Sequence, residues 1–396
     1  MPSRVTQALG FLGAVATLGV LVIPIEGGEP TPLVSPLPPP GDVREADIRF
    51  YQARVTTDPI GALDRMRLGA LLLDRARASG EARDLIRAEE LARESIALRQ
   101  AHNAAAWHLL AAALLGQHRF LEALEVAERL VAMNPEATGA RALRGEILLE
   151  LGRYPAADSV FAGLGLQRYQ PNVAPRYARW LELRGRSGGA RRLLERARVD
   201  AVRNGLPDDQ IAWYHLRLGE LALRHGRHRQ ARGWLESGLA IRPADWRLLA
   251  VRARLALAEG DGQLAIALGD SSLSLHFDPA TLALMGDAWA REGEPSRAEA
   301  FFRGLETAAG SAPRGGYHRA WYLALLDHQR QVPLVLAQVT RDLETRQDIY
   351  GWDLLAWALH QSGRRAEARA AMSLALQWGT DDPDLRRHTR AIEASP

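Results

Sequence analysis

From about Asp42 onwards, apolar residues recur at helical spacing in segments of about 12–14 residues, and short polar turns separate these segments. The segments are rich in Ala, Leu, Arg and Glu and contain few runs of β-branched residues, which favours helix over strand. Three turns repeat a pattern of Gly-Arg, a short gap and an alanine: LGRYPAADSVFAGL from Leu151, HGRHRQARGWLESGL from His225 and SGRRAEARAAMSLAL from Ser362. The chain is therefore predicted to be all-α and built from a repeated helical unit.

A small residue in the middle of one helix and an alanine about twelve residues later mark each copy of this unit. The pairs are Ala111 and Ala123, Gly145 and Ala157, Ala178 and Ala190, Gly219 and Ala231, Ala253 and Ala265, Gly286 and Ala298, and Ala356 and Ala368. Most successive units start about 33–34 residues apart, and one gap of 41 residues contains the lengthened turn AVRNGLPDD. Small residues let the two helices of a hairpin approach closely. Because one hairpin cannot bury its apolar stripe alone, the hairpins are expected to stack, each against its neighbours.

Glycine and proline place the ends of the predicted helices. Glycine can adopt the left-handed conformation that ends a helix, and we expect this at Gly152, Gly226, Gly260 and Gly363. Proline is tolerated in the first turn of a helix, so the joins between units are expected near Pro135, Pro243 and Pro279.

Two units, Ala104–Glu136 and Ile349–Pro383, carry the pattern of a known repeat. In the first, the pattern positions are Trp107, Leu110, Ala111, Leu114, Ala123, Ala127, Leu130 and Pro135; in the second, they are Trp352, Leu355, Ala356, Ala368 and Ala375. These stretches resemble the tetratricopeptide repeat (TPR) family, and the other units are degenerate versions of them. The resemblance implies an α-α superhelix, a TPR solenoid of about 8–9 hairpins over residues 43–396, with a capping helix after Pro383. It also implies a non-catalytic scaffold that binds a partner protein in its concave face.

The N-terminal segment differs from the rest of the chain. Arg4 precedes an apolar stretch from Ala8 to Ile25, and Glu26 and Glu29 follow it. Residues 1–25 are therefore predicted to be a hydrophobic signal-anchor or transmembrane helix, or alternatively a cleaved signal peptide. The charge asymmetry places the remainder outside the cytoplasm. Residues 26–42 are rich in proline and are predicted to be an extended linker.

The composition narrows the chemistry. All 50 basic residues are arginine, which is typical of a GC-rich bacterial genome, and the net charge is only +3 with no basic block, so nucleic acid is not an expected partner. The absence of cysteine excludes disulfides and thiolate metal sites. His225 and His228 lie in a turn without ligand spacing, and no zinc-protease or phosphate-loop motif occurs. We therefore predict no enzyme activity, cofactor or metal.

The predicted binding surface is the row of first-helix side chains that the repeat register turns inward. The row is Ala112, Glu146, Arg179, Glu220, Arg254, Asp287, Leu323 and Trp357, whose middle five members alternate in charge. Such alternation fits either a polar cradle for a peptide or a ladder of ion pairs between neighbouring repeats. The candidate partner-binding residues are Arg176, Arg179, Trp213, Arg217, Glu220, Arg247, Arg254, Tyr350, Asp353 and Trp357, because arginine and aromatic residues dominate binding surfaces.

Three functions remain open on the sequence. The first is an interaction scaffold of the bacterial cell envelope, anchored in the inner membrane with its repeats on the periplasmic side, or exported if the N-terminus is cleaved. The second is a protein that binds an envelope polymer such as peptidoglycan or a polysaccharide. The third is an unrecognised enzyme.

Overall fold

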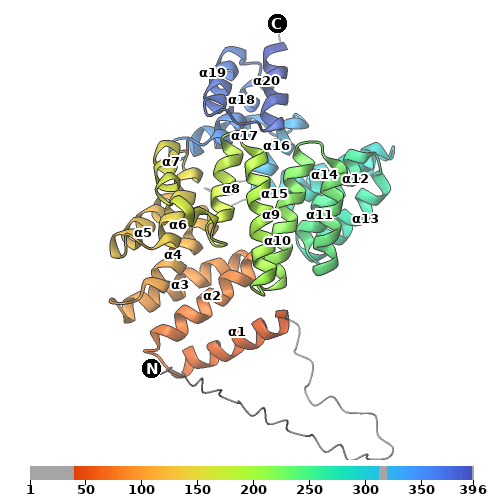
Figure 1. Ribbon diagram of the computed structural model, residues 1–396. Helices are drawn as coiled ribbons and strands as arrows, with labels where there is room; N and C mark the ends of the chain where they lie inside the picture. Colours follow the sequence, from red (N-terminus) through yellow and green to blue (C-terminus); the bar gives the residue numbers. More distant parts are fainter. Residues whose placement is uncertain (1–39, 312–318, 395–396) are drawn as a thin grey trace, which may run out of the picture. The chain divides into compact units, whose positions relative to one another are not determined.

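The computed structural model describes residues 40–311 and 319–394, and Pro40–Pro396 belong to one compact unit. Within the described ranges the chain forms twenty α-helices and one 3-10 helix and contains no strand, which confirms the all-α prediction (Figure 1). None of these helices is long and apolar enough to cross a membrane. The predicted hydrophobic segment 1–25 and nearly all of the predicted linker lie outside the described residues. The first helix begins at Pro40 and so includes the last three linker positions.

The helices pair into nine consecutive hairpins from α2 to α19, preceded by α1 and followed by α20. Their bounds are α1 (Pro40–Thr57), α2 (Ala62–Ser79), α3 (Ala82–Leu98), α4 (Ala104–Gly116), α5 (Phe120–Met133), α6 (Thr138–Glu150), α7 (Tyr154–Gly163), the 3-10 helix η1 (Gly165–Tyr169), α8 (Ala174–Leu183), α9 (Ser187–Arg203), α10 (Asp208–Arg224), α11 (His228–Ile241), α12 (Trp246–Glu259), α13 (Gly262–Leu275), α14 (Pro279–Arg291), α15 (Pro295–Ser311), α16 (Arg319–Asp327), α17 (Val332–Asp342), α18 (Ile349–Gln361), α19 (Arg365–Leu376) and α20 (Pro383–Ala394).

Small residues hold the hairpins together as predicted. A Cβ atom on Gly286 would lie 2.5 Å from the Phe302 ring, and one on Gly219 would lie 2.7 Å from Leu235. In both hairpins a large side chain of the second helix therefore packs directly on the backbone of the first. Such close packing leaves no room for an added methyl group unless the neighbour moves.

The last hairpin also packs against hairpins far away in the sequence, which the expectation of neighbour-only contacts did not include. The turn after α6 touches the segment before α18: the Gln347 amide donates to the Leu151 carbonyl at 3.3 Å, and the Ile349 amide donates to the Tyr154 hydroxyl at 2.8 Å. Tyr154 and Ile349 are both 1% exposed and belong to one continuous hydrophobic core. We call this contact the inter-turn interface.

Glycine permits this close approach. All four predicted turn glycines have positive φ, and Gly152, at φ +74°, lies where a Cβ atom would be 2.2 Å from the Gln347 carbonyl oxygen. Gly363 has the same φ but no neighbouring atom within 4 Å of that position. The turn glycine therefore ends a helix at both sites. Only at Gly152 does it also allow the backbones of distant hairpins to touch.

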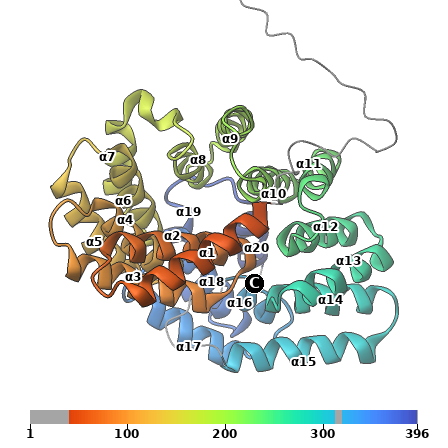
Figure 2. The same cartoon turned by 90° about the horizontal axis from the view of Figure 1, so that it is seen from below.

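The first hairpin makes a similar distant contact. Arg247, at the start of α12, donates to the carbonyl oxygens of Arg77 and Ala78 at the end of α2, the second at 3.2 Å. Arg44 on α1 pairs with Asp209 on α10 at 2.7 Å. Figure 2 shows α1 and α2 reaching towards α10. Cationic side chains are favourable at helix C-termini, so Arg247 stabilises the end of α2.

The predicted capping helix is α20, but it is not merely a solvating end. Leu385, His388 and Ile392 are spaced as one helical stripe and are at most 1% exposed, against α18 and the rest of the core.

Candidate interaction site

Charged side chains from α6, α8 and α10 form one connected strip, which we call the inner strip. Its members are Glu146, Arg176, Arg179, Arg217, Glu220 and Arg224, and each keeps 20–32% of its side-chain surface exposed. Arg217, Glu220 and Arg224 follow one another at three- and four-residue steps along α10, so they share one face of that helix. All of these except Arg224 were predicted to point inward.

The strip is held by one carboxylate that the sequence analysis did not single out. Glu182 on α8 is 5% exposed and lies near three guanidinium groups: Arg217 at 3.4 Å, Arg224 at 3.5 Å and Arg179 at 3.8 Å. A buried carboxylate is costly without such partners. Arg217 also pairs with Glu220 at 2.5 Å, and Arg224 lies 3.6 Å from Asp382, so this cluster of arginines attracts more than one carboxylate.

Two members of the predicted charge row form ion pairs with residues outside the row. Arg176 pairs with Glu146 of the preceding hairpin at 2.6 Å, and Asp287 lies 3.1 Å from His328 of the following one. Arg254 is exposed and acts on Glu220 through its charge. The inner strip therefore combines ion pairs between repeats with side chains that still face solvent.

The ionisation of Glu220 follows from these neighbours. Burial alone would raise the pKa of its carboxyl, but the charges of Arg217, Arg254 and Arg224 outweigh burial and hold the pKa below its usual value. Glu220 is therefore an anion at neutral pH.

An acidic segment of the chain itself occupies one end of the inner strip. The Ser187 hydroxyl donates to Asp381 at 2.6 Å, and Arg224 lies 3.6 Å from Asp382. His225, predicted to be a solvated turn residue, is instead half-buried and 3.5 Å from Asp381. These contacts show that this surface accommodates carboxylates.

Tyr350 completes this arrangement, but from a buried position. Its hydroxyl donates to Asp382 at 3.1 Å, and the guanidinium groups of Arg319 and Arg179 lie 4.1 Å and 4.9 Å from its ring centroid. Only 5% of Tyr350 is exposed. Cations near an aromatic ring are attracted to its face, so the ring also holds the two arginines in place.

Asp353 and Trp357 are likewise buried, and their side chains contact other residues of the chain. Asp353 is fully buried, accepts from Arg319 at 3.2 Å and lies 2.7 Å from the His388 ring nitrogen. Trp357 is 7% exposed and stacks between the His360 and His388 rings. Because the last hairpin and α20 pack around them, these side chains do not line an open groove as predicted.

Two further candidates also have structural contacts. Trp213 is partly buried against the hydrophobic cluster of α8, α9 and α10, and Arg247 holds the end of α2. Of the ten candidates, Arg176, Arg179, Arg217, Glu220 and Arg254 are thus the ones that face solvent from first helices of the repeats.

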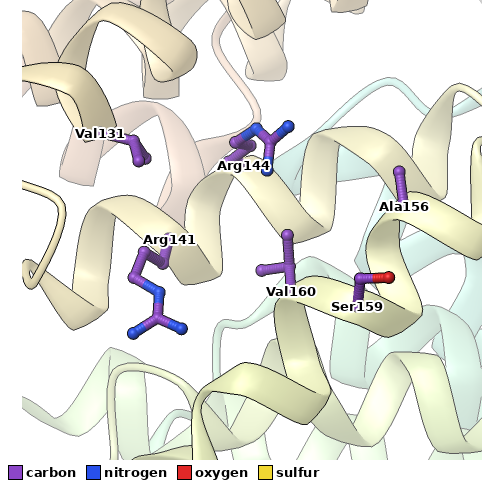
Figure 3. A pocket seen from close by; sticks show the side chains of 6 residues that line it. All are labelled: Val131, Arg141, Arg144, Ala156, Ser159 and Val160. Atoms are coloured by element: carbon purple, nitrogen blue, oxygen red, sulfur yellow. The ribbon is translucent and has the colours of Figure 1, made fainter.

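Two cavities in the described part of the chain are lined by residues that do not belong to this strip. One, of about 460 Å³, is lined by Val131, Arg141, Arg144, Ala156, Ser159 and Val160 (Figure 3). Figure 3 shows the Arg141 and Arg144 guanidinium groups pointing apart. Arg141 donates a hydrogen bond to the Gly163 carbonyl, and Arg144 forms an ion pair with Glu128. The second, of about 580 Å³, adjoins α20. No cluster of three potential metal ligands occurs within the described ranges.

Comparison with known proteins finds one matching family model and several solved structures with low sequence identity. A family model described as tetratricopeptide repeat matches residues 108–164 and 216–280. No curated protein matches the chain in sequence. PilW, a widely conserved type IV pilus biogenesis factor, is 18% identical over 53% of this chain and 96% of its own, with a TM-score of 0.45. Pseudomonas aeruginosa PilF is 16% identical over 53% and 93%, with a TM-score of 0.43. Cut9 in the APC/C assembly Cut9–Hcn1 is 16% identical over 87% and 58%, with a TM-score of 0.48.

The matched stretches cover most of α4 to α7 and of α10 to α13. The remaining hairpins repeat the same two-helix unit without interruption. The chain therefore contains tetratricopeptide repeats at residues 108–164 and 216–280.

Proposed function

We propose that the chain is a non-catalytic protein-interaction scaffold whose inner strip binds an acidic segment of a partner protein. The observation that carries this proposal is that Arg179, Arg217 and Arg224, whose side chains are 22–29% exposed, converge on the buried carboxylate of Glu182. Arginine binds carboxylates in a fixed, two-pronged geometry, so an acidic peptide would satisfy donors that Glu182 leaves incompletely paired.

The bound Asp381–Asp382 segment supports the same partner chemistry. It presents two carboxylates to Ser187, Arg224 and Tyr350, at the end of the inner strip. A partner carrying neighbouring acidic residues would make equivalent contacts further along the strip. The location in the cell envelope remains part of this proposal and rests on the sequence of residues 1–25, with Arg4 before the apolar stretch and Glu26 after it.

Site-specific photocrosslinking tests the proposal. A photoreactive residue at position 254, on the inner side, is expected to give a defined adduct in cells, whereas one at Ser237 on α11 is not. Arg176→Ala with Arg217→Ala should abolish the adduct, because both side chains face solvent and would contact the ligand directly.

The matched control is Arg229→Ala with Arg303→Ala, which removes two exposed arginines from other helices. Both double variants should keep the helical circular dichroism of the parent. Adducts of equal yield at both labelled positions, or an adduct that survives the inner-strip substitutions, would contradict the proposal. Sequencing of the adduct adds a second criterion, because the crosslinked peptide must be rich in Asp and Glu.

A further inference from the structure

The surface formed by η1 and α9 exposes large apolar side chains. Leu166 is 83% exposed, Val202 50%, Val199 37% and Tyr169 36%. The opposite face of α9 is packed into the core, with Ala197 1% exposed. In Figure 2, α9 lies on the outer side of α8 and α10. This helix therefore has an outer apolar face with no partner among the described residues.

The same surface concentrates positive charge. Residues 165–169 and 187–203 contain six arginines against two carboxylates, a net charge of +4, whereas the whole chain carries +3. The expectation of evenly mixed charge therefore does not hold here, because η1 and α9 are separated in sequence but adjacent in space. The Arg196 guanidinium carbon lies 5.7 Å from the Tyr169 ring centroid, which joins the two elements into one patch.

The arginines are arranged as a stripe that remains available. Arg192, Arg196, Val199 and Arg203 follow at steps of four, three and four residues, so they share one face of α9. Arg196 and Arg203 are 68% and 76% exposed and both lie about 4 Å from the one carboxylate of Asp200. Exposed pairs of this length contribute little, so both guanidinium groups can bind another anion.

Leu166 and Tyr169 extend the stripe with apolar surface. They are three residues apart on a 3-10 helix, which has three residues per turn, and so they project to the same side. Arginine, leucine, valine and tyrosine side chains thus lie together on one exposed surface. We define the outer basic patch as Leu166, Arg168, Tyr169, Arg192, Arg196, Val199, Val202 and Arg203.

We propose that the outer basic patch binds the surface of a membrane that contains anionic phospholipid. A bilayer interface offers phosphate groups and hydrocarbon at nearly the same depth, which suits arginines interleaved with exposed aliphatic side chains. Arginine can bury its methylene stem while its charged end stays with the phosphates. Nucleic acid suits the patch less well, because bases stack on free aromatic faces and Tyr169 is the patch's one aromatic ring, with the guanidinium groups of Arg168 and Arg196 near it.

The experiment follows one position of the patch in the full chain. The chain contains no cysteine, so Val202→Cys can carry a single environment-sensitive fluorophore, and Ser237→Cys on α11 provides the control position. Phosphatidylcholine vesicles with phosphatidylglycerol should shift the emission at position 202 to the blue and protect the label from iodide. Position 237 should remain accessible, and pure phosphatidylcholine should have no effect on either.

Charge reversal tests the electrostatic part. Arg192→Glu, Arg196→Glu and Arg203→Glu together should raise the vesicle concentration needed for half of the shift by roughly a hundredfold. The control variant, Arg83→Glu with Arg229→Glu and Arg303→Glu, changes the net charge by the same amount. It should change the vesicle concentration needed for half of the shift by no more than about threefold. High salt should release the label of the unmodified patch, which provides a readout that needs no arginine variant.

The proposal requires that the fluorophore at position 202 enters the membrane surface. If the protein co-sediments with anionic vesicles while this label stays fully quenched, another part of the chain makes the contact and the proposal is wrong. Equal protection on neutral vesicles, or binding of the label only to an acidic protein or to RNA, would overturn it as well.

Discussion

The inter-turn interface predicts a large difference between two glycine substitutions that look alike in sequence. Gly152 and Gly363 both precede arginine, both follow the first helix of a hairpin and both have φ +74°. Alanine in the left-handed region costs about 1 kcal/mol at either site. Only at Gly152 does the new methyl group also meet backbone atoms, 2.2 Å from the Gln347 carbonyl oxygen.

The additional cost at Gly152 follows from the contacts that must separate. Relief of the clash moves Gln347 away from Gly152, and this breaks the hydrogen bonds from Gln347 to Leu151 at 3.3 Å, from Ile349 to Tyr154 at 2.8 Å and from Arg346 to the Glu150 carbonyl at 2.8 Å. Each is worth about 1 kcal/mol. Gly152→Ala is therefore expected to lower the free energy of unfolding by about 4 kcal/mol, and Gly363→Ala by about 1 kcal/mol.

Urea denaturation followed by tryptophan fluorescence measures both values, because Trp180 and Trp378 flank Tyr154 at 5.8 Å and 5.3 Å. Hydrogen exchange at the amides of Gln347 and Ile349 locates the change, since both amides donate across the interface. They should exchange faster in Gly152→Ala and normally in Gly363→Ala. Equal losses of stability in the two variants would refute the reasoning, because the backbone contact would then contribute nothing.

Four further substitutions follow from local packing and charge. Gly233→Ala should stabilise the chain by about 1 kcal/mol in thermal unfolding, because no atom lies within 4 Å of the added methyl group and alanine favours helix; Gly286→Ala should instead destabilise it by about 1–3 kcal/mol through the contact with Phe302. Asp382→Ala should cost about 2 kcal/mol in the same assay, because Arg224 and the buried Tyr350 lose their carboxylate, and a neutral effect would exclude that role. Burial, helped by a nearby arginine, lowers the pKa of His215 below its usual value, so its protonation in the unfolded state opposes folding as the pH falls below about 6.5. Stability measured from pH 7.5 down to pH 5.5 should therefore fall less steeply in His215→Leu than in the parent, and identical slopes would contradict this.

The repeat and its hairpins could be predicted from the sequence because their signals are local. Gly219 and Leu235 belong to one hairpin, and each glycine or alanine in the pattern reports the close approach of two helices joined by a short turn. The shared helix face of Arg217 and Glu220 on α10 followed from the same register, since helical spacing fixes which side chains share a face.

The burial of the last hairpin's candidates could not be predicted in this way. Trp357 is in register with Arg179, Glu220 and Arg254, but Trp357, Tyr350 and Asp353 are buried by contacts with α20 and with the segment before it. One signal was available: Asp353 lies within the apolar stretch IYGWDLLAWAL, and a lone carboxylate in such a stretch indicates a buried pair. Its partner, His388, lies in a segment that composition alone described as a polar cap.

The sequence by itself determined the helices and their pairing, because these depend on residues a few positions apart. The tertiary structure alone decided which of those side chains stay open to solvent, that Glu182 collects three arginines, and that η1 and α9 form one basic surface. Small angles between successive hairpins add up along the chain, and their sum brings Gln347 onto Gly152 across almost half of the sequence. No single residue encodes that sum, so only the folded chain reveals where distant hairpins meet.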